Sequence, residues 1–319
     1  MQNLWNKAGR CISCSGELSI FTKGFYDTRF GIKQKYKIGR CESCGTDQIL
    51  PLPSIKQLKD LYETYYNFGG EKGTAYTGFR EYFFSSFLYP FWLIVDGDVS
   101  FHAERGSGRL LDIGCNEGRG LSIYRKHGFD AEGMELNEQA AAEAKKRGFS
   151  VHIAILEKFH PKEPYDVVVL ANVLEHSLDP KNMLSHAHRI LKPGGHLWIS
   201  CPNNQSWLRV LFGKYWINWH VPFHIVHFSN KSLCNILLEE RFRVESIHQE
   251  TPAIWAAHSL ISLLFAKPGQ PTKRLRDPFL ISFLIIFIRI FLFSAIWVGN
   301  KLGHGDCIVL KAVKNQGEF

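Results

Sequence analysis

The chain has 319 residues, of which 45% are hydrophobic and 21% are charged, a composition that excludes a disordered or collagen-like protein. Its formal net charge of +8 comes from the two ends, since residues 1–60 hold ten Lys and Arg against five Asp and Glu, and residues 267–319 hold eight against three. Basic ends around a neutral centre predict that the ends meet an anionic surface, either phospholipid or nucleic acid, while the centre holds a small-molecule site.

The first predicted module, residues 1–54, is a zinc ribbon. It contains two Cys-x-x-Cys pairs, and each pair can aim two thiolates at one metal ion, so that together they complete a tetrahedral shell. Four thiolates leave no open position on the metal, which favours structural Zn²⁺ over catalytic zinc. Cysteines used in this way, without a signal peptide ahead of them, indicate a reducing, cytosolic setting. The predicted ligands are Cys11, Cys14, Cys41 and Cys44.

A helical and aromatic segment follows at residues 55–105, with Tyr62, Tyr65 and Phe91 among its aromatic residues. We predict that it forms a helical cap and linker over the mouth of the next domain. The alternative is that these aromatic side chains simply belong to the hydrophobic core.

The central region alternates short apolar runs with amphipathic stretches, which predicts an α/β fold with a doubly wound, Rossmann-like sheet. We place this domain at residues 106–251, and a last strand within 304–315 completes it. The expected strands are 109–114, 130–136, 150–153, 166–171, 196–201, 242–248 and 306–313. The expected helices lie near 118–127, 137–147, 180–191 and 230–240.

A very apolar excursion at residues 252–303 precedes the last strand. Its second apolar run, 279–298, has a single charge, Arg289, and is long enough to span a bilayer. The first run, 254–266, is too short to span, and the chain must return to the sheet. We therefore predict a monotopic helical hairpin in one leaflet; a spanning hairpin and a buried or oligomer-forming one are the alternatives. The basic side chains expected near lipid phosphates are Lys267, Lys273, Arg274, Arg276 and Lys301.

Several motifs fall at the carboxyl ends of the expected strands. Residues 110–118, LLDIGCNEG, read as a strand, a glycine-bearing turn and a helix start, an arrangement that lets backbone amides approach a ligand. Glu135 ends the second strand, where a carboxylate can accept both ribose hydroxyls. The later motifs are Tyr165-Asp166, Val173-Leu174-Glu175-His176, Asp179-Pro180, Leu191-Lys192-Pro193-Gly194-Gly195 and Cys201-Pro202-Asn203. In this order and spacing, the sequence resembles the class I S-adenosylmethionine-dependent methyltransferases, especially the branch related to the ubiquinone-biosynthesis O-methyltransferases.

This resemblance covers about residues 105–250 and the last strand, and it implies S-adenosylmethionine as the cofactor. In the family, the glycine turn contacts the methionine part of the cofactor, and this chain has Asn where the family usually has its middle glycine. The implied cofactor-binding positions are Asp112, Gly114, Asn116 and Gly118 in the turn, Glu135 and Leu136 at the ribose, Leu156 and Glu157 beside the adenine, and Asn172 facing the sulfonium and substrate.

The family's reaction is an in-line displacement, in which alignment of the two reactants can supply much of the catalysis. We consider His176 and His224 as candidate general bases, since histidine readily supplies a base near neutral pH. Capping or loop-fixing roles are the alternative for both, and we assign such roles to His220 and His227. A metal site among these histidines is not expected, because no matching carboxylate is evident and Asn172 replaces the first Glu of the family's Glu-x-x-Glu-His run.

The sequence thus predicts a methyltransferase that acts on a small-molecule or lipid-linked acceptor, a sugar or a prenylated aromatic, with O-methylation favoured. We expect it to be peripheral or monotopic on the cytoplasmic face of a membrane. One rival is an RNA methyltransferase that uses a basic ribbon, but nucleic acid is disfavoured by the apolar hairpin and by Asn172-Val-Leu-Glu in place of an Asn/Asp-Pro-Pro-aromatic motif. The other rival is an inactive membrane scaffold. The acceptor atom and the oligomeric state are left open.

Overall fold

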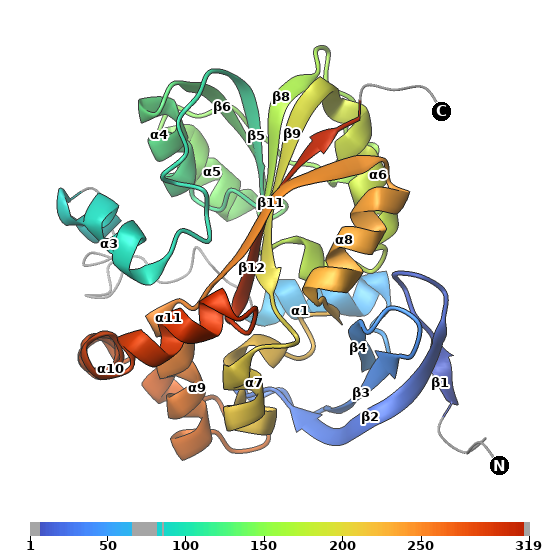
Figure 1. Cartoon of the computed structure of the whole chain (residues 1–319), viewed down its shortest axis with the longest axis vertical. Coiled ribbons are helices and arrows are strands. Elements are labelled where there is room, and N and C mark those ends of the chain that lie inside the picture. Colours follow the sequence, from blue (N-terminus) through green and yellow to red (C-terminus); the bar gives the residue numbers. More distant parts are fainter. Residues whose placement is uncertain (1–6, 66–81, 85, 316–319) are drawn as a thin grey trace.

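The computed structural model describes residues 7–65, 82–84 and 86–315, and Figure 1 shows two sheets with helices around them. The large sheet runs through the upper part of the view, with helices on both faces. The small sheet lies below it, at the end of the molecule where the parallel strands of the large sheet finish. Apolar helices occupy the lower left of the view.

The large sheet has seven strands in the order β11-β12-β9-β8-β5-β6-β7. Five strands are parallel, while β12 pairs antiparallel with both β9 and β11. The predicted doubly wound, Rossmann-like sheet is confirmed, and its last strand is inserted between two earlier ones. The strands are β5 (Gly108–Ile113), β6 (Phe129–Met134), β7 (Val151–His152), β8 (Tyr165–Ala171), β9 (Leu191–Pro202), β11 (Phe242–Glu250) and β12 (Cys307–Lys314).

The central strand β8 is buried on both faces, because successive side chains of a strand point to opposite faces and most of its side chains are apolar. In β8, Val168 and Leu170 belong to one core cluster, while Val167 and Val169 belong to the other. Helices α4 (Arg119–Lys126) and α5 (Glu138–Lys146) cover one face, and α6 (Pro180–Ile190) and α8 (Asn230–Glu239) cover the other (Figure 1).

The small sheet is the ribbon, and it is joined to the large domain by a shared strand. Its strands are β1 (Lys7–Arg10), β2 (Glu17–Tyr26), β3 (Lys35–Cys41) and β4 (Asp47–Leu50). β10 (Val226–His227), from the middle of the large domain, pairs antiparallel with β4. After the ribbon come α1 (Ile55–Tyr65) and, beyond the undescribed residues, α3 (Leu88–Asp96). The ribbon is therefore held against the carboxyl ends of the parallel strands.

The apolar excursion folds as three helices, α9 (Ala253–Phe265), α10 (Pro278–Phe291) and α11 (Phe293–Lys301). The apolar run expected at 279–298 is broken at Leu292, so α10 and α11 meet at an angle of 72°. In the described part of the chain, no single helix is both long and apolar enough to cross a bilayer, although the bent pair meets that test together. α9 and α10 share a core that includes Ala257, Ile261, Ile281 and Ile288.

Candidate methyl-transfer site

The glycine turn joins β5 to α4 and contains three residues with left-handed backbone. Gly114, Asn116 and Gly118 have φ values of 75°, 49° and 75°. Asparagine is one of the few residues besides glycine that adopts this conformation readily, so Asn116 replaces the family's middle glycine without changing the type of loop. At Gly118, an added Cβ would lie 2.9 Å from the Cβ of Ala144, so only glycine lets the turn pack against α5.

Glu135, directly after β6, joins the turn to the start of α5. One carboxylate oxygen accepts a hydrogen bond from the backbone N–H of Asn116 at 3.0 Å, and the other accepts from that of Asn137 at 2.8 Å. Each carboxylate oxygen keeps further acceptor capacity. The side chain therefore lies beside the glycine turn and can still accept two hydroxyl groups. Leu136, its neighbour, is mostly exposed.

Asp112, the last acidic residue of β5, is buried. Burial, and secondarily the charge of Glu135, raise the pKa of its carboxyl group to about 7. A protonated Asp112 can donate a hydrogen bond, a capacity that an ordinary surface aspartate lacks near neutral pH.

The other cofactor positions lie after β7 and β8. Leu156 is buried in the core at the start of a short 3-10 helix, and Glu157 beside it is partly exposed. Asn172 follows β8 with a left-handed backbone, and its N–H donates to the carbonyl of Ser200 at 2.9 Å. Its side-chain Oδ1 is buried and accepts no hydrogen bond from any described residue. The turn, the carboxylate at the strand end and this unused acceptor fit S-adenosylmethionine.

The two candidate bases lie next to each other, although 48 positions separate them in the sequence. His176 follows β8 in a 3-10 turn, and His224 lies in the loop before β10; their ring centres are 4.7 Å apart. Nδ1 of His176 lies 2.9 Å from the hydroxyl of Tyr62 on α1 and 3.0 Å from the carbonyl of Phe223. Nδ1 of His224 lies 2.7 Å from the carbonyl of Asn218, and since a carbonyl only accepts, His224 carries its proton on Nδ1. Nε2 of His224 therefore holds a lone pair.

Both histidines are neutral near pH 7. Burial lowers the pKa of His176 to about 4 and lowers that of His224 well below its usual value. Their pKa values are therefore lower than that of the near-neutral base expected from the sequence. Each ring can accept a proton, although burial disfavours the charged form.

Glu175 provides the carboxylate that the sequence analysis did not recognise. Its Oε1 lies 4.0 Å from Nε2 of His224, and neither carboxylate oxygen has a hydrogen-bond partner among the described residues. Burial raises its pKa to about 8. Donor atoms of Glu175, His176 and His224 all lie within 4.8 Å of one another. One carboxylate and two imidazoles suit a divalent transition metal, so the expectation that no carboxylate accompanies these histidines is corrected.

The walls of this histidine cluster come from segments outside the large domain. Phe30 lies in the loop after β2 of the ribbon. The centre of its ring is 5.9 Å from the ring centre of His220 and 5.5 Å from that of Phe223. Tyr62 on α1 packs against Phe223 at 5.4 Å. Sequence reasoning missed Phe30 because no local motif marks it. His227, on β10, lies against Trp219, consistent with the structural role assigned to it.

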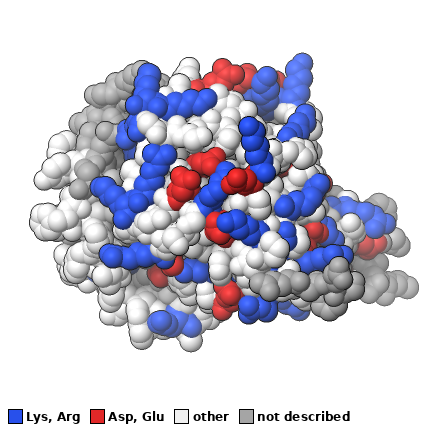
Figure 2. Space-filling model, turned by 90° about the horizontal axis from the view of Figure 1, so that it is seen from above, with Lys and Arg blue, Asp and Glu red and all other residues white. Residues whose placement is uncertain are grey.

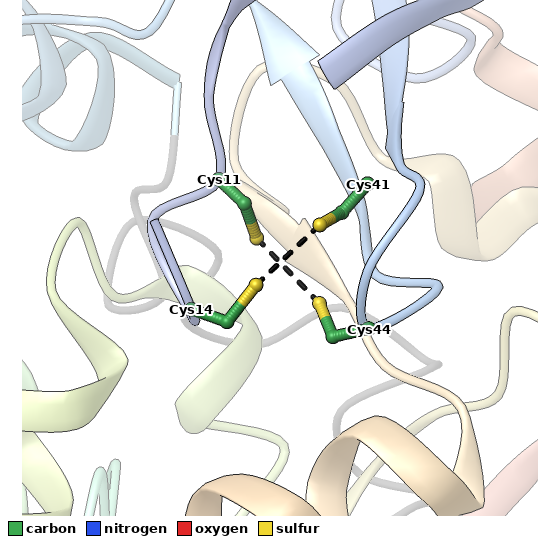
Figure 3. A group of neighbouring side chains, drawn as sticks. All are labelled: Cys11, Cys14, Cys41 and Cys44. Carbon is green, nitrogen blue, oxygen red and sulfur yellow. Dashed lines mark hydrogen bonds between the residues drawn. The ribbon is translucent and has the colours of Figure 1, made fainter. Parts of the chain in front are cut away.

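The four ribbon cysteines converge on one point (Figure 3). The Sγ atoms of Cys11 and Cys44 are 3.7 Å apart, those of Cys14 and Cys41 are 3.4 Å apart, and all four lie within 4.8 Å of one another. Ser15 and Gly45, each directly after a second cysteine, have φ values of 61° and 76°, which lets the chain turn around a shared ion. The donor set and turns fit the predicted structural Zn²⁺.

Comparison with known proteins agrees with this geometry. Residues 94–247 match a family model described as a methyltransferase domain. The ubiquinone biosynthesis O-methyltransferase of Klebsiella pneumoniae is 28% identical over 138 residues, which are 39% of this chain and 57% of that protein. A protein of Mycolicibacterium smegmatis described as a "probable S-adenosylmethionine-dependent methyltransferase" is 31% identical over 147 residues, which are 45% of this chain and 55% of that protein. This chain thus spans a little over half the length of the curated relatives it matches.

Among solved structures, that of a 1,6-didemethyltoxoflavin N1-methyltransferase from Burkholderia thailandensis aligns with 89% of this chain and 97% of its own, at 14% identity and a TM-score of 0.46. The fold and the glycine turn agree with the match of residues 94–247 to a methyltransferase domain. This part of the chain is similar to the ubiquinone biosynthesis O-methyltransferases.

Proposed function

We propose that this protein transfers a methyl group from S-adenosylmethionine to an oxygen atom of a small-molecule or lipid-linked acceptor at the cytoplasmic face of a membrane. One observation carries the proposal. The glycine turn and Glu135 end β5 and β6, and the cluster of His176 and His224 follows the neighbouring strand β8. A cofactor site and a polar site with aromatic walls therefore share one edge of the sheet.

Bound at this edge, S-adenosylmethionine supplies a methyl group activated by its sulfonium. The chain's own residues position the reactants and handle the proton. Glu135 would accept the ribose hydroxyls, and the chain would hold the acceptor oxygen in line with the methyl carbon, so that the new bond forms as the bond from sulfur to methyl breaks and S-adenosylhomocysteine leaves. The acceptor's proton passes to Nε2 of His224, because the carbonyl of Asn218 holds the proton of Nδ1 in place. Phe30 and Tyr62 exclude water from the cluster.

The low pKa of His224 limits the kind of acceptor. A weak base accepts a proton efficiently only from a hydroxyl that is already acidic, which favours a phenolic group such as that of a quinol precursor over an aliphatic sugar hydroxyl. A divalent cation held by Glu175, His176 and His224 would make a bound hydroxyl more acidic and would widen this range to sugars.

Two further features support a lipid-linked acceptor. The helices of the 252–303 excursion expose large apolar side chains, and similar proteins are named for ubiquinone biosynthesis. A prenylated aromatic acceptor would have both an acidic hydroxyl group and an apolar chain that can contact the apolar helices. A sugar on a polyprenyl carrier would have only the apolar chain.

The first test is calorimetric titration of S-adenosylmethionine and S-adenosylhomocysteine into the full-length, zinc-loaded protein. We expect micromolar-range binding that falls at least tenfold in Glu135→Ala. The matched control is Glu138→Ala, an exposed carboxylate three residues further on in α5, which should bind as the unaltered protein does. Absence of binding to the folded protein would refute the proposed activity. Transfer of labelled methyl groups to prenylated phenols and to polyprenyl-linked sugars then identifies the acceptor class.

A further inference from the structure

The two basic ends of the sequence meet in the folded protein. The ribbon loop between β2 and β3, residues 27–34, lies against the connector between α9 and α10, residues 266–277. Phe30 forms a β-bridge with Pro271, and the N–H of Thr272 donates to the carbonyl of Arg29 at 3.0 Å. At Gly31, an added Cβ would come within 2.7 Å of the backbone nitrogen of Pro271. The contact is close and backbone-mediated, so the two segments form one surface.

This surface carries exposed cations from both sides. Cγ of Lys33 lies within 3.4 Å of the position that a Cβ on Gly269 would take, so the ribbon lysine lies directly on the connector. Asp277 is the one acidic residue of the connector, and Arg274 pairs with it. We call these cations the basic rim; its members are Lys33 and Lys35 from the ribbon and Lys267, Lys273, Arg274 and Arg276 from the connector.

An apolar surface begins at both ends of the connector. On one side, α9 ends in Leu263, Leu264 and Phe265, all exposed. On the other side, α10 buries Ile281, Leu284 and Ile288 against α9 and yet exposes a second apolar stripe on its outer side. We call the exposed side chains the apolar face; they are Leu263, Leu264, Phe265, Phe279, Phe283, Ile286, Phe287, Ile290, Phe291 and Trp297.

A helix that is apolar on all sides is normally buried in protein or in lipid. Phe279 is 86% exposed, and the rings of Phe283, Phe287 and Phe291 contact each other in sequence along the outer stripe. Residues 278–305 contain no Asp or Glu. On the face of the molecule shown in Figure 2, Lys and Arg side chains lie among Asp and Glu side chains. An acid-free apolar surface bordered by cations matches an anionic bilayer.

We propose that the basic rim and the apolar face form one docking surface for an anionic phospholipid bilayer, in which the zinc ribbon supplies headgroup contacts through Lys33 and Lys35. The apolar face enters the acyl boundary of one leaflet, and the rim remains at the level of the phosphates. This inference rests on the proposed function, because the docking surface would bring the enzyme to a lipid-linked acceptor. The loop that carries Lys33 also carries Phe30, which lines the histidine cluster, so docking places the acceptor site beside the headgroups.

The test is co-flotation of the full-length, zinc-loaded protein with vesicles of phosphatidylcholine alone or with one-third phosphatidylglycerol. Each cation near an anionic surface contributes about a fivefold gain in partitioning, so reversing two of them should lower binding to anionic vesicles by more than tenfold. The ribbon variant is Lys33→Glu/Lys35→Glu, and the connector variant is Lys267→Glu/Lys273→Glu. The control, Lys126→Glu/Lys145→Glu, makes the same charge change at exposed positions on α4 and α5. A fourth variant, Phe283→Ser/Phe287→Ser, should lose binding to both kinds of vesicle.

Equal losses in the ribbon and connector variants, with binding retained in the control, support the proposal. A ribbon variant that floats like the control overturns the role of the ribbon. Failure of the unaltered protein to float overturns the docking surface. If light scattering shows dimers that form through the apolar face, a second copy of the chain occupies that face instead. S-adenosylmethionine titration of every variant separates this outcome from failure of the proposed function, because the cofactor positions lie outside the rim; a protein that floats without binding cofactor refutes the activity alone.

Discussion

Arg289 of α10 forms an ion pair with Asp96 at the end of α3, and both side chains are only 8% exposed. The guanidinium also donates to the carbonyl of Thr251, while Asp96 accepts from the backbone N–H of Ala253 at 2.8 Å. The single charge of the apolar run therefore points into the protein, and it fastens α10 to α3 and to the start of α9.

We expect Arg289→Met to lower the free energy of unfolding by about 3–5 kcal/mol, because it leaves the Asp96 carboxylate buried without its cation. Burial already raises the pKa of Asp96, and Arg289 opposes that shift. The measurement is urea denaturation at pH 7.5. The double variant Arg289→Met/Asp96→Asn should recover part of the loss, whereas equal stability of the single variant and the unaltered protein would contradict the importance of the pair.

Asp112 should make stability depend on pH in a defined direction. Its pKa in the folded protein is about 7, above the ordinary aspartate value near 3.9, so the folded state binds its proton more tightly. The stability from this group is fully present below pH 4 and is lost as the pH rises through 7. Asp112→Asn removes that dependence. The measurement is the difference in unfolding free energy between the two proteins from pH 5 to 8; a constant difference would contradict the shift.

Removal of zinc should loosen the ribbon and reduce activity together. The ribbon carries Phe30 to the histidine cluster and pairs with β10, which lies a few residues after His224. We expect that a strong chelator, or the substitution Cys44→Ser, removes one zinc ion per chain, which mass spectrometry measures. The loss of zinc should lower the Tm by more than 5 °C and decrease kcat. Cys234→Ser is the control, because Cys234 lies on α8, outside the cluster. Full activity without zinc would refute this link.

His224 and Glu175 can be distinguished by kinetics. If His224 accepts the proton, His224→Asn should lower kcat about 10²- to 10⁴-fold with little change in cofactor Kd, and His227→Asn should affect mainly stability. Glu175→Gln removes the carboxylate of the candidate metal site but leaves Nε2 of His224 intact. A second metal ion per chain that is lost in Glu175→Gln, while the ribbon zinc remains bound, indicates a metal at this cluster. One metal ion per chain in both proteins excludes it.

The order of strands and helices in the large domain could be predicted because local patterns determine it. The apolar run of β8 predicts a strand buried on both faces, and Asp179 followed by Pro180 marks the start of α6, where the Asp179 side chain accepts from the N–H of Asn182. The expected boundaries of α4, α5, α6 and α8 agree with the structure to within a residue or two. β9 begins five residues earlier than expected, at Leu191, because the extended chain passes through Pro193 and Gly194 before the apolar run.

The site was harder to predict, since its residues meet through long-range contacts. Glu175 is next to His176 in the sequence, but its closeness to His224 depends on two features of the fold. One is the 3-10 turn after β8, and the other is the hydrogen bond that the N–H of Ile225 donates to the backbone carbonyl of Glu175. The pairing of β10 with β4 and the approach of Phe30 have no local signal. The pKa values of the histidines follow from burial, which a motif does not reveal.

The position of β12 has a consequence for biosynthesis. This strand fills the gap between β9 and β11, yet it is translated after both of them and after the three apolar helices. Until it arrives, β9 has an unpaired edge and β11 has no partner in the sheet. Closure of the sheet is therefore a late event of synthesis, and loss of the last strand would leave β9 with an open edge and β11 without a partner, which favours aggregation.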